Sequence, residues 1–157
     1  MEQELTISDV CDMSGTPHAH LWLNRFGEHK PAKPGNGKRG SARYTLCMAL
    51  SIRVARSLDK RFGIEPKDLI GLTSHIWNMG TAELLAEFDK NKTCVIVVGR
   101  KVCDTFFPPT AVNDFDAALK ARGANGIDVF AISVEHEFKR MCETLAPEQL
   151  LPEPEVN

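Results

Sequence analysis

Apolar side chains recur at helical spacing along the first part of the chain. Between residues 16 and 26 they fall at every third or fourth position, and between residues 44 and 62 they fall at every fourth. Thr6, followed by Asp9 three residues later, is the start signal of an earlier helix. The pattern predicts helices over residues 7–13, 17–26, 44–62, 66–78 and 81–89.

The period changes after residue 92, where runs of β-branched and aromatic residues replace the helical stripes. Residues 93–98 and 102–107 flank a turn candidate that starts at Gly99, which predicts a hairpin with Cys94 and Cys103 across from each other. The remaining expected elements are a third strand over 127–132 and helices over 111–122 and 134–145, the last one capped by Ser133.

In this order the elements predict an α+β fold. A winged helix-turn-helix over residues 1–62 is followed, over residues 63–146, by a helical connector and a small mixed α/β domain for dimerisation or partner binding. Residues 147–157 are rich in Pro and Glu, and they are expected to form a disordered tail.

The net charge of −2 conceals an uneven distribution. Residues 1–62 carry ten Lys and Arg against six Asp and Glu, and all ten bases lie between Arg25 and Arg61. A basic segment joined to an acidic one is typical of a polyanion-binding part beside a part with another task, although a solvated basic face gives the same count. Three bases of the long helix are expected only to form such a face: Arg53, Arg56 and Lys60.

Two short helices joined through Ser14 and Gly15 have the pattern of a helix-turn-helix. In this motif the first helix supports the second, which presents a polar face to the DNA major groove. The glycine-rich segment over 28–41 that follows carries several bases, as expected of a wing that grips the DNA backbone. The predicted DNA-binding residues are Thr16, His18, His20, Asn24 and Arg25 in the second helix and Lys33, Lys38, Arg39 and Arg43 in the wing.

The opening run from Leu5 to Val10, the Ser14-Gly15 turn and the Arg43-Tyr44 pair before a long helix resemble the N-terminal domain of MerR-type regulators. The same stretch is similar to excisionase-like and phage small-terminase DNA-binding domains. The resemblance covers residues 6–58, and it implies DNA binding through the second helix and the wing. It does not extend to the long dimerising helix of a MerR regulator, because the helix predicted over 66–78 is too short.

Other classes of protein find no support in the sequence. The five cysteines are odd in number and widely spaced, so neither a disulfide framework nor a zinc site is predicted, and a metal site at Cys11 with the nearby histidines is disfavoured. Known phosphate-loop, zinc-protease and hydrolase motifs are absent, so we expect no enzyme and no cofactor. No apolar run reaches the ~18 residues of a membrane span, and the acidic N-terminus is unlike a secretion signal, so a cytoplasmic location is expected.

We therefore expect a sequence-specific transcription regulator of bacterial, prophage or mobile-element genes, which binds double-stranded DNA as a homodimer. Its C-terminal part is expected to form the dimer or to bind a protein partner. Two alternatives stay open. One is a packaging protein like a small terminase, or an excisionase-like architectural protein, that uses the same two helices. The other is a partner-binding α/β module whose basic N-terminus holds nucleic acid without sequence preference.

Overall fold

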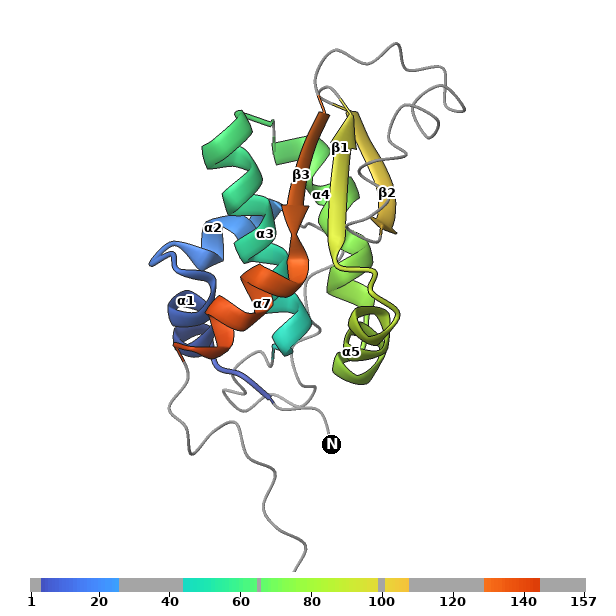
Figure 1. The fold of residues 1–157 in the computed structure, drawn as a ribbon. Helices are drawn as coiled ribbons and strands as arrows, with labels where there is room; N and C mark the ends of the chain where they lie inside the picture. The colour runs from blue at the N-terminus through green and yellow to red at the C-terminus, as the bar shows by residue number, and fades with distance from the viewer. Residues whose placement is uncertain (1–3, 26–43, 65, 99–100, 108–128, 145–157) are drawn as a thin grey trace, which may run out of the picture.

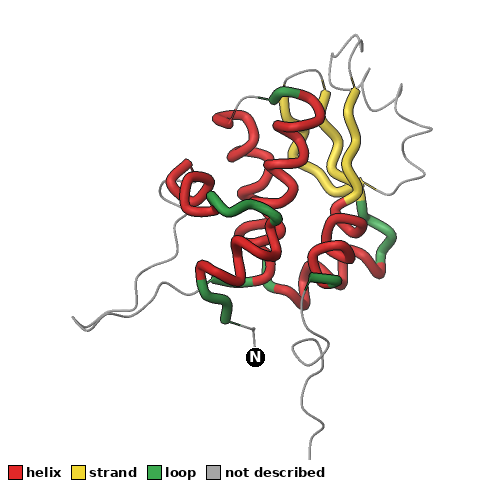
Figure 2. The backbone as a smooth tube through the Cα atoms, turned by 90° about the vertical axis from the view of Figure 1, so that its left-hand side faces the viewer, coloured by secondary structure: helices red, strands yellow, loops and turns green. Residues whose placement is uncertain are grey.

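The computed structural model describes the chain over residues 4–25, 44–64, 66–98, 101–107 and 129–144. Helices make up most of these ranges, and three strands lie together at one side of them (Figures 1 and 2). The elements are α1 (Ile7–Ser14), α2 (Ala19–Arg25), α3 (Leu46–Phe62), α4 (Pro66–Asn78), α5 (Thr81–Asp89), β1 (Cys94–Val98), β2 (Lys101–Phe107), β3 (Val129–Ser133) and α7 (Val134–Cys142).

Capping residues bound α1 at both ends. The Thr6 hydroxyl accepts a hydrogen bond from the Asp9 amide (3.3 Å), and the Asp9 carboxylate accepts one from the Thr6 amide (2.7 Å). This reciprocal pair satisfies donors that have no partner inside the first turn of a helix. Gly15, in the left-handed conformation with φ 69°, ends the helix. The helix predicted over 7–13 is therefore confirmed, with Ser14 added.

α2 and α3 each begin two residues later than predicted, for local reasons. The Thr16 hydroxyl accepts a hydrogen bond from the His18 amide (3.2 Å), so residues 16–18 form a turn before the helix starts. Tyr44 is paired in extended conformation with Leu5, and Thr45 is the residue that caps α3, through the Met48 amide. α4 and α5 have the bounds predicted for them.

The three strands form one antiparallel sheet in the order β2-β1-β3. The predicted hairpin and third strand are confirmed, with bounds shifted by one or two residues. The β1–β2 register places Cys94 opposite Phe107, so the prediction that Cys94 faces Cys103 is wrong. An irregularity between Val95 and Val97 shifts the pairing, and hydrophobic alternation alone does not reveal such a shift.

α3 lies at the centre of the helices and contacts α1, α4 and α7 (Figure 1). Its one buried hydroxyl, on Ser51, donates to the carbonyls of Cys47 (2.8 Å) and Thr73 (3.2 Å), so no polar atom of this side chain is left unpaired. The residues that α3 buries lie on several of its faces: Cys47, Ala49, Leu50, Ser51, Ile52, Val54, Ala55 and Leu58. One cluster of buried side chains runs from Leu5 near the N-terminus to Met141 in α7.

The predicted fold class, a winged helix-turn-helix followed by a mixed α/β domain, is wrong. The part of the chain with described coordinates is mainly helical, and before α3 its only extended pairing is the single bridge between Leu5 and Tyr44. α7 packs against α1 and α3 instead of building a separate α/β layer, because Val134 and Met141 are buried in the same core as the N-terminal helices. Apolar spacing identifies a buried face of a helix but not the element that covers it.

The core joins residues from both sides of the boundary suggested after residue 62. The domain bounds 1–62, 63–146 and 147–157 stay predictions. Residues 26–43, where the wing was expected, residues 111–122, expected as a helix, and the expected tail lie outside the described residues. Among the helices that the structure describes, none is both long and apolar enough to cross a membrane.

Candidate nucleic-acid interface

The turn between α1 and α2 is closed by backbone hydrogen bonds and by a glycine. The Gly15 amide donates to the Asp12 carbonyl (3.2 Å), and the Thr16 amide donates to the Cys11 carbonyl (3.1 Å). The left-handed backbone of Gly15 suits a residue without Cβ, because an L side chain is strained there. The chain thus reverses tightly between two short helices, as the motif requires.

Thr16 serves this turn. Its side chain is buried, at 6% exposed, and its hydroxyl accepts the hydrogen bond from the His18 amide. Thr16 was predicted to bind DNA, but its side chain is buried, whereas His18 and His20 are exposed.

α2 has one buried face and one exposed face. Ala19 and Trp22 are buried in the core, as their place on the apolar stripe predicts. His18, His20 and Leu21 are exposed, and the two histidine rings pack edge to face with centroids 6.1 Å apart. Leu21 is 47% exposed, so its side chain is accessible to an apolar group such as the thymine methyl.

Asn24 and Arg25 occupy the last two positions of α2, and their backbone is helical. Their side chains, and residues Lys33, Lys38, Arg39 and Arg43, lie outside what the structure describes. The histidines are thus the predicted contacts that the structure places together on an exposed surface.

The structure does describe the residues on either side of the basic segment over 26–43. It starts where α2 ends, and it returns to Tyr44, whose amide and carbonyl exchange hydrogen bonds of 3.1 and 2.8 Å with Leu5. Leu5 lies two residues before the start of α1, so both ends of the segment lie next to the pair of helices α1 and α2. Burial raises the pKa of the Tyr44 phenol above its ordinary value.

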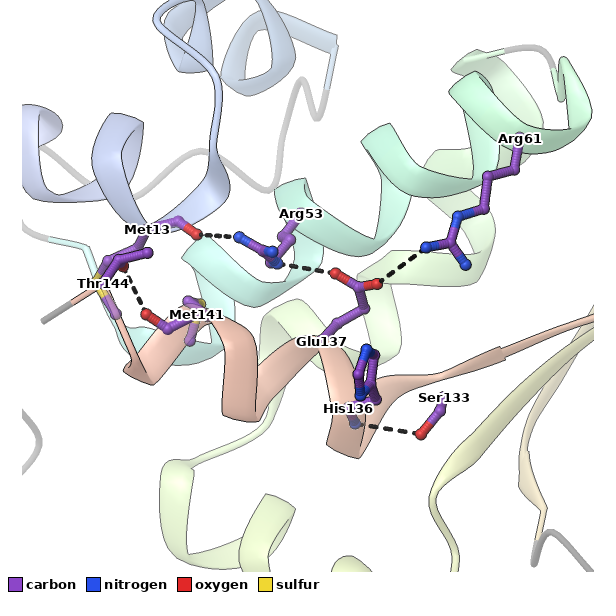
Figure 3. A network of polar contacts seen from close by, with 8 residues as sticks. All are labelled: Met13, Arg53, Arg61, Ser133, His136, Glu137, Met141 and Thr144. Atoms are coloured by element: carbon purple, nitrogen blue, oxygen red, sulfur yellow. Dashed lines mark hydrogen bonds and ion pairs between the residues drawn. The ribbon is translucent and has the colours of Figure 1, made fainter.

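A buried charge network connects α1, α3 and α7 (Figure 3). Arg53 Nε lies 2.8 Å from Glu137 Oε2, and Arg53 Nη1 donates to the Met13 carbonyl at 3.0 Å. Arg61 Nη2 lies 3.8 Å from the other carboxylate oxygen of Glu137. The Glu137 side chain is only 4% exposed and the Arg53 side chain 16%, so this ion pair is largely shielded from water, whereas the Arg61 side chain is 53% exposed.

The prediction that Arg53 belongs to a solvated face is therefore wrong. One signal in the sequence pointed to the network: Val134, Glu137 and Met141 share one face of α7, so a glutamate interrupts an apolar stripe. Such a charge is buried only when it has a partner, but the sequence does not show which base pairs with it.

Within the described ranges, no group of three or more His, Cys, Asp or Glu side chains is placed to hold a metal ion. Cys11, Cys47 and Cys142 form no disulfide within the described part of the chain. Comparison with known proteins gives no match: no protein-family model, no curated protein and no solved structure is similar to the chain. The MerR-like resemblance therefore stays a prediction from the residues.

Proposed function

We propose that this chain is a sequence-specific DNA-binding regulator, and that the exposed face of α2 enters the major groove. The observation that carries the proposal is that α2 has one buried face and one exposed face. Ala19 and Trp22 are buried in the core, while His20 and Leu21 are exposed on the other side of the helix and His18 is exposed directly before it. α1 and α3 support it from behind, which is the arrangement that base reading by a helix requires.

Charge supports the same proposal. The segment over 26–43 carries Lys and Arg, and its ends leave and rejoin the helix-turn-helix at Arg25 and Tyr44. A base-reading helix is weak without contacts to the phosphate backbone, and bases attached beside it supply them. We assign Lys33, Lys38, Arg39 and Arg43 to this role, and Asn24 and Arg25 to the reading helix.

The proposal includes a cytoplasmic protein of bacterial, prophage or mobile-element origin that acts without catalysis or cofactor. It also includes a homodimer, because one small helix-turn-helix covers few base pairs and two half-sites multiply specificity. The same proposal leaves room for a protein partner that binds the C-terminal part of the chain.

Selection from a random duplex pool tests the reading of sequence. We expect the selected duplexes to share a motif and to bind at least about 1,000-fold more tightly than random duplex at physiological salt. The double variant His20→Ala/Leu21→Ala should lose most of this preference, whereas Leu85→Ala, exposed on α5 away from α2, should keep it. Equal affinity for selected and random duplex would contradict the proposal and favour non-specific binding.

The basic segment is expected to act on all sequences alike. Replacing Lys38 and Arg39 with alanine should weaken binding to selected and random duplex by the same factor, and should lower the slope of log K against log salt by about 1.8, since each phosphate contact contributes about 0.9. Lys90→Ala/Lys92→Ala is the matched control, because it removes two exposed lysines that follow α5. A slope equal to that of the control would show that the segment does not touch the backbone.

A further inference from the structure

Two arginines of α3 reach the turn between α1 and α2. A Cβ atom built on Gly15 would lie 3.1 Å from Arg56 Nη1 and 3.6 Å from Arg53 Nη1. Both guanidinium groups therefore lie against the turn, although they come from the third helix of the chain. The sequence pattern predicted Arg53 and Arg56 on one solvated face, and the structure gives them different surroundings.

The charge of Arg53 is already compensated. It pairs with Glu137 and donates to the Met13 carbonyl, while the remaining oxygen of Glu137 faces Arg61. α1 has no basic residue of its own in its last turn, and Arg53 supplies the positive charge that favours this helix end. Among these arginines, Arg53 is the one that donates a hydrogen bond to a carbonyl at this helix end.

Arg56 has no such partner within the described residues. It makes no ion pair or hydrogen bond there, and it is half-buried beside the turn. Over α3 and α7 together, six Lys and Arg side chains stand against three acids, Asp59, Glu135 and Glu137, so these two helices carry a net positive charge. A guanidinium group that is held in place and uncompensated is suited to bind phosphate, with two parallel hydrogen bonds.

We infer that Arg56 binds a phosphate of the DNA backbone beside the helix-turn-helix turn, so that the interface extends from α2 onto α3. This inference rests on the proposed function. In that function α2 lies in the major groove. The phosphate backbone at the edge of the groove then runs close to α1 and to the turn that joins it to α2. His18 is exposed directly after the turn, so a strand in contact with the start of α2 also passes Arg56.

The test compares Arg56→Gln and Arg56→Lys with the parent chain, using the selected duplex and a random duplex between 50 and 200 mM salt. Arg56→Gln should weaken binding to both duplexes by the same factor and lower the salt slope by about 0.9, so that affinity falls about 3.5-fold less across this range. Arg56→Lys keeps the charge but not the paired hydrogen bonds, so it should retain the slope while losing part of the affinity. Lys90→Gln, which removes an exposed charge next to α5, should behave as the parent chain.

Each result is decisive. If Arg56→Gln keeps the parent slope while Lys38→Ala/Arg39→Ala lowers it, this inference is overturned and the proposed function stands. If the parent chain binds no duplex, both are overturned. A merely structural role for Arg56 would reduce the midpoint of urea unfolding and the affinity without changing the salt slope, and it would also overturn the inference.

Discussion

Replacing Glu137 with alanine is expected to lower the free energy of unfolding by about 3–5 kcal/mol, the usual cost of removing one partner from a buried ion pair. The reason is the place of its carboxylate, which is 4% exposed and 2.8 Å from Arg53 Nε. Without it, Arg53 keeps its hydrogen bond to the Met13 carbonyl but loses its counter-charge, and a guanidinium group is costly to keep away from water. Urea unfolding monitored by far-UV circular dichroism measures the change.

Glu135 provides the matched control for this variant. It also lies on α7 and also forms an ion pair, at 2.6 Å from Lys139, but its side chain is 32% exposed. Glu135→Ala should therefore cost less than about 1 kcal/mol, because water and salt screen exposed pairs. Glu137→Gln keeps an acceptor for Arg53 without the charge and should fall between the two alanine variants. Equal losses for Glu135→Ala and Glu137→Ala would contradict the buried network.

Replacing Leu50 with alanine is expected to lower the free energy of unfolding by about 2–5 kcal/mol. Leu50 is fully buried in the second turn of α3, the helix that contacts α1, α4 and α7. Removing its branched end leaves a cavity in the cluster that these helices share, and a close-packed interior closes such a cavity only in part. The midpoint of urea unfolding should fall while the m-value stays the same.

Leu85→Ala makes the same chemical change at an exposed site. Leu85 lies within α5 and is 44% exposed, so little apolar surface is lost to water when it is shortened. Because both leucines are inside helices, the difference in helix propensity cancels between the two variants. Leu85→Ala should change stability by less than about 0.5 kcal/mol. A comparable loss at both positions would mean that α3 is not the centre of the core.

Local signals accounted for most of the helix ends. Thr6 with Asp9 marked the start of α1, Gly15 and Gly63 marked the ends of α1 and α3, and Ser133 marked the start of α7. These signals are reliable because a cap and the helix it bounds lie within a few residues of each other. The start of α2 was predicted two residues too early. There the His18 amide donates a hydrogen bond to the Thr16 hydroxyl, and residues 16–18 form a turn instead of helix.

The sequence could not show which residues far apart along the chain contact each other. α7 was assigned to a separate domain, yet Val134 and Met141 pack with the N-terminal helices. The pairing of Arg53 with Glu137 joins positions 84 residues apart, and no local pattern indicates which base meets a given acid. The exposed surface with His18 and His20 was predictable because it follows from the position of Trp22 on the apolar stripe.

The distance along the chain between Arg53 and Glu137 also bears on how the protein is made. A ribosome adds about 5–20 residues per second, so Arg53 emerges roughly 4–17 s before the carboxylate that neutralises it. During that interval α1, α2 and α3 have left the ribosome, but the guanidinium group beside their turn has no counter-ion from α7. Synthesis of α7 thus supplies the counter-charge for Arg53, and a chain that stops before Glu137 leaves this guanidinium group beside the end of α1 without its carboxylate partner.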